Sequence, residues 1–270
     1  MSYLHGDQRT IALTESNVVA TSASITAPLL IGGLAAAGWG WQPALVLTLP
    51  GALLLWWVFR SVQFPRSLPL ATHHAAGHRL PLAFWMLCVV LFLVASVEWC
   101  VVYWGADFLA SVVGLERAAA ASAMTLFFVA MAGGRLLGSR LARCYAGVTL
   151  LLAAIVIALG GFLLFWLAAA PLVSLIGLFV AGLGIANFYP LTVAVATGAA
   201  PHLIDRATAR LAVAGGAALL LAPLAVGAIS DVAGMRWGFG IVAPLLLIAF
   251  VSAVISSRFL GRPSPDTECG

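Results

Sequence analysis

One acidic residue lies deep inside a long apolar stretch. Glu98 stands near the middle of residues 82–104, with apolar side chains on both sides of it. A carboxylate near the centre of a bilayer costs about 2.5–3.5 kcal/mol on insertion scales, and removal from water favours its neutral form. A carboxyl group that binds a proton in one state and releases it in another suits proton coupling. A structural carboxyl group, hydrogen-bonded across helices, is the alternative.

The same stretch carries a second polar stripe. Ser96, Trp99, Tyr103 and Asp107 follow the spacing i, i+3, i+7 and i+11, which places them on one face of a helix. Glu98 is about 100° away from Trp99 around such a helix and therefore points elsewhere. Tyr103 is close enough to the end of the stretch to be an interfacial anchor. Trp99 lies deeper and is a candidate to line a cavity that receives a substrate.

Residues 171–198 combine polar side chains with a proline. Pro190 frees a backbone carbonyl near the middle of the membrane, where broken helices often line substrate sites. Asn187 and Tyr189 are therefore further candidates for contact with a substrate or proton. Interhelical contact at a kink is an equally good explanation for both. Three small residues share one face and predict close packing against another helix: Gly177, Ala181 and Gly184.

The elements that carry these residues are too apolar for water. The chain of 270 residues is 63% hydrophobic and 8% charged, with a mean hydropathy of +1.10. A soluble domain is about 25% charged, and this chain has too few polar residues to cover a globule. The composition excludes a soluble globular protein, a secreted disulfide scaffold and a disordered tail. The 13 basic residues are all arginines in small scattered groups, so no nucleic-acid partner is expected.

Eight apolar stretches are long enough to cross a bilayer as helices. About 20 residues are needed for a hydrocarbon core of ~30 Å, and continuous apolar runs exclude the alternating pattern of a β-barrel. The fold class predicted is therefore an all-α, polytopic membrane helix bundle. The predicted spans are 17–37, 41–59, 82–104, 118–138, 147–168, 171–198, 209–229 and 238–259.

The arginines predict how the chain is oriented. Eleven of them fall in connections on one side of the predicted bundle, and only Arg117 and Arg236 fall on the other. The positive-inside rule then places both termini in the cytoplasm, as an even number of spans requires. We therefore expect a protein of the cell or inner membrane whose immediate partner is the lipid bilayer.

Residues 60–81 form the only long polar linker and divide the spans into two and six. His73, His74 and His78 lie in it, but no carboxylate or cysteine in the segment completes a metal site. We interpret them as part of a solvated loop, and expect neither a metal nor another cofactor. The spans contain no HExxH, no GxSxG and no apposed carboxylates, so an enzyme is not expected.

Five local patterns resemble the major facilitator superfamily. The sequence GRLLGSRLAR at 134–143 is similar to the cytoplasmic motif between the eighth and ninth helices of that family, with Gly138 at a place often acidic there. APLAVGAISDVAGMRWGF at 222–239 resembles the stretch that joins the last two helices. The resemblance implies four candidates for gating loops: Arg135, Arg140, Asp231 and Arg236.

The other three patterns resemble individual helices of the family. Glu98 followed by Trp99 resembles the seventh helix, residues 182–191 (GLGIANFYPL) the tenth, and residues 9–33 the entry to the fifth. The family has twelve helices in two halves joined by a cytoplasmic loop. The chain therefore resembles helices five to twelve, with the first four, about 120 residues at roughly 30 per span and loop, absent.

This resemblance implies a domain organisation. Residues 1–60 would be the last two helices of an N-terminal half, and 61–81 the cytoplasmic central linker. Residues 82–260 would be the six-helix C-terminal half, and 261–270 a cytoplasmic tail.

The function implied by the resemblance is transport of a small solute by alternating access, as a fragment of a secondary transporter. Protons are a possible partner through Glu98, and the substrate is not indicated. The alternative is a truncated, non-transporting membrane protein or a scaffold subunit that needs a partner chain. The layout of two spans before the linker and six after it motivates that alternative.

Overall fold

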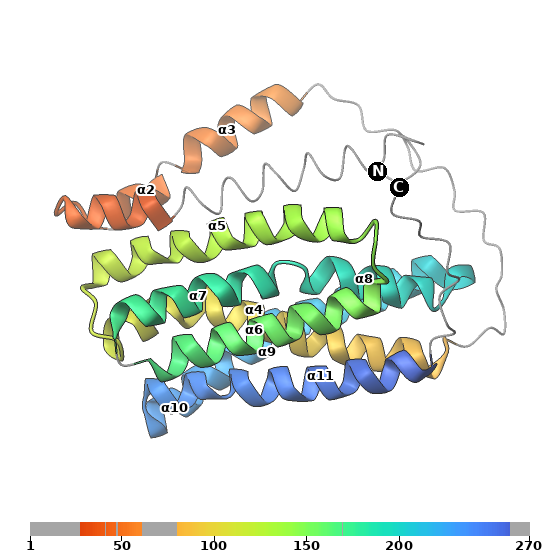
Figure 1. Cartoon of the computed structure of the whole chain (residues 1–270). Coiled ribbons are helices and arrows are strands. Elements are labelled where there is room, and N and C mark those ends of the chain that lie inside the picture. The colour runs from red at the N-terminus through yellow and green to blue at the C-terminus, as the bar shows by residue number, and fades with distance from the viewer. Residues whose placement is uncertain (1–27, 41, 47, 61–79, 169, 260–270) are drawn as a thin grey trace.

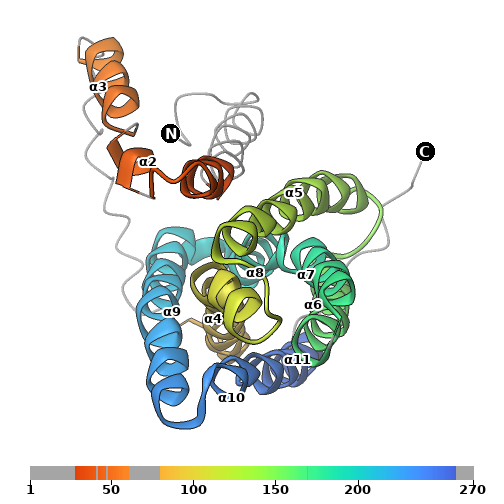
Figure 2. The same cartoon turned by 90° about the vertical axis from the view of Figure 1, so that its left-hand side faces the viewer.

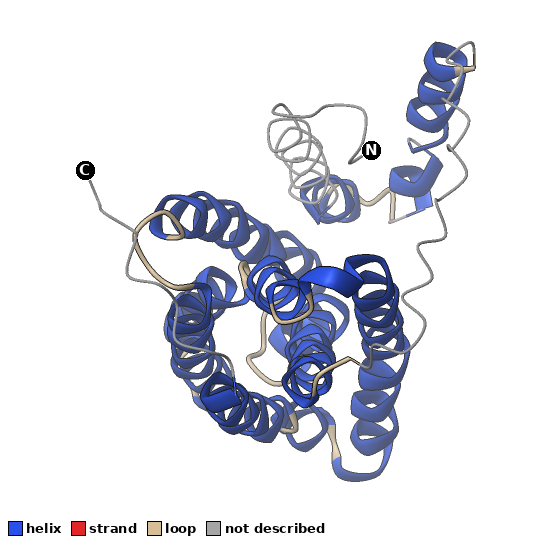
Figure 3. Cartoon of the chain, turned by 90° about the vertical axis from the view of Figure 1, so that its right-hand side faces the viewer, coloured by secondary structure: helices blue, strands red, loops and turns tan. Residues whose placement is uncertain are grey.

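The computed structural model describes residues 28–40, 42–46, 48–60, 80–168 and 170–259. These residues form helices joined by short turns, with no strand among them (Figures 1 and 3). The helices, besides a helical segment at 28–36, are α2 (Gln42–Val46), α3 (Thr48–Phe59), α4 (Leu82–Ser111), α5 (Arg117–Leu141), α6 (Gly147–Leu167), α7 (Pro171–Ile185), α8 (Phe188–Gly198), α9 (Ile204–Ala233), α10 (Met235–Gly240) and α11 (Val242–Phe259).

Seven stretches of the described chain are helices long and apolar enough to span a membrane, and they match the predicted spans from residue 41 onward. The largest differences from the predicted spans are in α4, which continues to Ser111, and in α9, which extends from Ile204 to Ala233. Buried packing explains the extension of α4, since Phe108 and Leu109 are completely buried beyond the predicted end. Most of the first predicted span and most of the linker, with its three histidines, lie outside the described residues.

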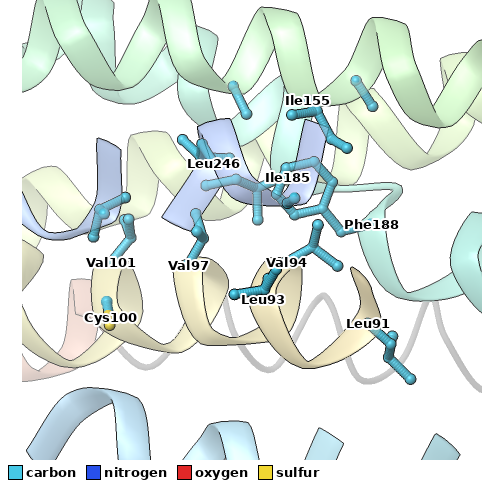
Figure 4. Close-up of a cluster of buried hydrophobic side chains, with 14 of the residues drawn as sticks. Leu91, Leu93, Val94, Val97, Cys100, Val101, Ile155, Ile185, Phe188 and Leu246 are labelled. Carbon is cyan, nitrogen blue, oxygen red and sulfur yellow. The ribbon is translucent and has the colours of Figure 1, made fainter. Parts of the chain in front are cut away.

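Helix α4 occupies the centre of the bundle formed by residues 82–259. Figure 2 shows α5 and α7 to α11 arranged around it, and α4 packs directly against α5, α8, α9 and α11. More than half of its residues are buried. Figure 4 shows the apolar contact that results, where Val94 and Val97 of α4 lie beside Ile185, Phe188 and Leu246.

Small residues bring α6 and α7 into close contact. A Cβ atom added at Gly177 would lie 2.8 Å from the carbonyl oxygen of Gly161, and one at Gly184 would lie 2.6 Å from that of Ala154. Neither glycine has room for a side chain. The close packing predicted for the face of Gly177, Ala181 and Gly184 is confirmed.

Four phenylalanines form a buried cluster near the α10 end of the bundle. The ring of Phe108 lies 5.0 Å from that of Phe165 and 4.9 Å from that of Phe239, centroid to centroid. Phe162 completes the cluster at 5.4 Å from Phe239. Aromatic pairs at these separations add to the free energy gained from burial alone. The cluster packs α4 and α6 against α10 and thereby fixes the position of this short helix.

The helices before the linker are less embedded. Helix α3 has no buried residue, and its large apolar side chains, such as Leu53 and Trp56, are more than half exposed. The helical segment at 28–36 contacts the bundle where a Cβ atom at Gly32 would overlap Ser122 of α5. Exposed apolar surface of this kind is expected to face lipid or another helix.

Candidate functional site

The helix predicted over 171–198 is broken in its middle. Ala186 and Asn187 are turn residues between α7 and α8, and Asn187 has φ −105° and ψ 4°. Pro190 is the third residue of α8 and has no N–H to donate to the carbonyl four positions earlier. That carbonyl belongs to Ala186, so it needs a donor from elsewhere.

Helix α5 supplies the missing donor. Nε of Arg135 donates to the carbonyl oxygen of Ala186 at 3.4 Å. In the opposite direction, Nδ2 of Asn187 donates to the carbonyl oxygen of Gly134 at 2.7 Å. Two hydrogen bonds therefore fasten the break between α7 and α8 to neighbouring residues of α5.

Two glycines of α5 allow this close approach. A Cβ atom at Gly134 would lie 2.7 Å from both Cβ of Ala186 and the carbonyl oxygen of Leu183. A Cβ atom at Gly138 would lie 2.5 Å from Cγ of Asn187. Gly138 stands at a place that is often acidic in the family motif. The structure explains the glycine, because the side chain of Asn187 occupies the space that a larger residue would need.

Glu98 lies on the side of α4 that faces α5. Seven residues further along the same face, a Cβ atom at Gly105 would lie 2.9 Å from Sδ of Met124 in α5. The Glu98 side chain is partly buried and interacts electrostatically with the guanidinium group of Arg135. Arg135 thus donates to the broken helix and also acts electrostatically on a carboxyl group of α4.

Trp99 and Tyr189, the other two predicted site residues, lie elsewhere. The ring of Trp99 is 6.0 Å from that of Tyr103, on a face of α4 that becomes exposed towards Asp107. Tyr189 is 46% exposed, and its ring lies 3.5 Å from the Cβ position of Gly215 in α9. The described hydrogen bonds therefore bring Arg135 and Asn187 together at the break, with Glu98 within electrostatic reach of Arg135, and leave Trp99 and Tyr189 apart from them.

The four gating candidates separate into two pairs. Arg135 lies within α5 and is partly buried, while Arg140 is exposed in the last turn of the same helix. Asp231 is exposed near the end of α9, at the opposite end of the bundle (Figure 1). Arg236 is the second residue of α10 there, and its Nη2 donates to the carbonyl oxygen of Leu167 at 3.5 Å. The carbonyl oxygen of Arg236 accepts a hydrogen bond from Nε1 of Trp166 at 2.8 Å.

One contact was not predicted from the sequence. Nε1 of Trp104 donates to the carbonyl oxygen of Pro223 at 2.8 Å, and the indole ring covers Gly227. The spacing of Pro223 and Gly227 on one face of α9 is visible in the sequence and indicates room for a large side chain. Nothing in the spacing identifies Trp104 as that side chain.

Metal ligands do not gather in the described part of the chain. No group of three or more His, Cys, Asp or Glu residues there is arranged to hold a metal ion.

The apolar bundle and its broken helix define an integral membrane protein with a polar site inside. The model of the Major Facilitator Superfamily matches residues 87–269. This chain belongs to that superfamily, whose members are membrane transporters of small molecules rather than enzymes.

Two similar proteins support this assignment. An uncharacterized MFS-type transporter of Yersinia pestis is 29% identical over 172 residues, which cover 64% of this chain and 44% of that protein. The crystal structure of a bacterial homologue of the human lysosomal transporter Spinster, in an inward-facing and occupied conformation, covers 97% of this chain and 73% of that chain. Its TM-score is 0.69 at 16% identity, so the likeness shows a shared fold. The chain spans less than half of the length of the curated relative it matches.

Proposed function

We propose that this chain takes part in the transport of a small solute by alternating access, and that Glu98 carries the coupled proton. The observation that supports Glu98 is its position halfway along the central helix, within electrostatic reach of the guanidinium group of Arg135. A carboxylate beside an arginine keeps its charge by pairing, and a protonated carboxyl group gives up that pairing. The pair therefore has two states that differ by one proton.

The proposal includes a place for each part of the chain. Residues 82–260 would form the six-helix C-terminal half of the transporter, and residues 1–60 the last two helices of the other half. The residues between would form the central linker, and residues 261–270 the tail. The exposed face of α4 that carries Trp99 and Tyr103 would meet the solute. Arg140 and Arg258 lie at the bundle end that we assign to the cytoplasm.

A spectroscopic experiment tests the proton site without a known substrate. Infrared difference spectra of the chain in liposomes, recorded between alkaline and acid pH, should contain a carboxylic C=O band that Glu98→Gln removes. Glu116→Gln is the matched control, because Glu116 is exposed just before α5 and should leave that band in place. A difference spectrum that Glu98→Gln does not alter would show that Glu98 keeps one protonation state.

A transport experiment tests the coupling itself. Vesicles containing the full-length transporter would be screened with labelled small solutes, and uptake of any transported solute measured against external pH. Glu98→Gln should abolish the pH dependence of uptake, and Glu116→Gln should preserve it. Uptake by Glu98→Gln with unchanged pH dependence would remove Glu98 from the mechanism.

A scaffold subunit that needs a partner chain is the second candidate. It is favoured by α3, which has no buried residue although its side chains are apolar. Under this hypothesis the chain reconstituted alone carries no solute. Flux above that of empty vesicles would refute it.

A further inference from the structure

We propose that Trp104 is a positioning residue that fixes the second part of α9 to α4, so that α9 bends at Pro223 and only its first part moves. The first part is residues 204–222, and the second part is residues 223–233. This inference rests on the proposed transport function, because alternating access requires that helices change their positions. The geometry that carries it is one hydrogen bond from α4, which reaches α9 at the proline itself.

Pro223 weakens α9 at a point inside the helix. A proline has no N–H, so the carbonyl of Leu219 lacks the donor that a helix normally supplies, and the proline ring crowds that carbonyl. Sharp bends in long helices occur mostly at such residues. The two parts of α9 can therefore change their angle at Pro223 without breaking a backbone hydrogen bond between them at this position.

Trp104 attaches the second part of α9 directly at this weak point. Its Nε1 donates to the carbonyl oxygen of Pro223 at 2.8 Å. A carbonyl oxygen has two lone pairs, so this bond can be made beside the one within the helix. One turn further along, a Cβ atom at Gly227 would lie 3.0 Å from Cζ2 of the indole ring. The indole therefore contacts two successive turns of α9, and both belong to the second part.

Helix α10 holds the second part from its other end. A Cβ atom at Gly238 would lie 2.7 Å from the carbonyl oxygen of Val226, so α10 folds back closely against α9. Phe239 of α10 stacks on Phe108 of α4, and the bond from Trp166 attaches α10 to α6. The second part is thus fixed to α4 and, through α10, to α6 (Figure 2).

The first part of α9 has weaker attachments. Its buried side chains are small apart from one leucine: Ala207, Leu211, Ala218 and Ala222. Within the described part of the chain, none of its residues makes a side-chain hydrogen bond to another helix. On the side of α8, the ring of Tyr189 lies 3.5 Å from the Cβ position of Gly215. Apolar contacts of this kind can shift without loss of a hydrogen bond, so the first part is the one that can move.

Hydrogen–deuterium exchange of the full chain in lipid nanodiscs tests this proposal. Trp104→Phe removes the bond to Pro223 and keeps a ring beside Gly227. It should increase local opening of the second part about fivefold, the change expected for loss of one hydrogen bond. Opening of the first part should stay the same, because the helix is interrupted at Pro223. Trp85→Phe is the matched control, since Trp85 is exposed on the same helix, and it should leave both parts unchanged.

A second variant tests the bend itself. Pro223→Ala supplies the missing N–H for the carbonyl of Leu219 and makes α9 continuous. Opening of the first part should then fall, because the first part is attached to the fixed second part. When Trp104→Phe is added to Pro223→Ala, opening should increase in both parts together.

Three results would overturn the proposal. Trp104→Phe might leave the second part unchanged, or increase opening equally in both parts and in peptides from α6, as loss of an ordinary core contact would. Pro223→Ala might fail to reduce opening of the first part. Each of these results would show that Trp104 and Pro223 do not divide α9 into a fixed and a moving part.

The two proposals fail separately. If no solute is transported while the two parts of α9 respond independently, the fixing of the second part by Trp104 stands and the transport function is refuted. If uptake is measured but α9 opens as a single unit, the positioning role of Trp104 is refuted and transport stands.

Discussion

At the scale of single residues, a neutral contact occupies the place where the family motif is often charged. Gly138 leaves space for Asn187, whose side-chain amide donates to Gly134 at 2.7 Å. An acidic residue at this place would have to displace Asn187 from the break between α7 and α8. Gly138 and Asn187 therefore depend on each other for this contact, although 49 positions separate them in the chain.

Gly138→Ala should lower the stability of the chain by about 1–3 kcal/mol, because the added methyl group overlaps Asn187. The measurement is the midpoint of thermal unfolding in detergent. Gly133→Ala is the control, since its added Cβ atom meets nothing within 4 Å and alanine is the better helix former. Asn187→Ala should recover part of the loss in a double variant. Equal midpoints for the two alanine variants would contradict the close contact.

Trp104→Phe should cost about 1 kcal/mol of stability, because the hydrogen bond to Pro223 is lost while most of the ring surface remains. Trp85→Phe serves as the comparison, since Trp85 is 47% exposed on the same helix. Thermal unfolding of the two variants in the same detergent separates the contributions. A smaller loss for Trp104→Phe than for Trp85→Phe would mean that the bond contributes nothing.

At the scale of helices, the sequence predicted which helix faces pack closely better than it predicted which helices they pack against. The spacing of Gly177, Ala181 and Gly184 correctly indicated a closely packed face, because small residues repeated on one side of a helix allow another helix to approach closely. It could not identify α6 as the partner, since the matching residues there are ordinary alanines and Gly161. The break at Asn187 was expected from Pro190, but its attachment to α5 depends on contacts between distant segments.

Two neighbouring glycines of α6, Gly160 and Gly161, provide a test of the close packing between α6 and α7. Gly161→Leu should prevent α7 from packing against α6 and cause loss of the folded monomer, because backbone atoms of Val180 and Ala181 would be overlapped. Gly160→Leu adds the same side chain one position earlier, where nothing lies within 4 Å, and should be tolerated. Size-exclusion profiles of the two variants after detergent extraction provide the readout. A monodisperse Gly161→Leu variant would show that α6 and α7 are not closely packed at this position.

At the scale of the whole molecule, hydropathy alone predicted most of the fold. Seven predicted spans are helices because an apolar stretch in lipid must satisfy its own backbone groups. The candidate site was harder to predict. Glu98 stands out by its cost in a membrane, whereas its partner Arg135 resembled a residue of a cytoplasmic motif. Only the antiparallel packing of α4 and α5 brings the two residues within electrostatic reach of each other.

The arginine distribution predicts that the bundle end with Arg140 and Arg258 faces the cytoplasm. Green fluorescent protein fused to the C-terminus should therefore fluoresce in bacterial cells, because it folds on the cytoplasmic side. Alkaline phosphatase fused at the same point should be inactive. Active phosphatase together with a dark fluorescent fusion would reverse the orientation.

The central position of α4 has a consequence for synthesis of the protein. Helix α4 leaves the ribosome first among the six membrane spans of its bundle, yet two of its main neighbours, α9 and α11, are made last. At about 5–20 residues per second, several seconds pass before those neighbours exist. During that interval lipid, the insertion machinery or α5 must accommodate the acidic side chain. Helix α5, which carries Arg135, is made next and would pack against α4 until α9 and α11 are inserted.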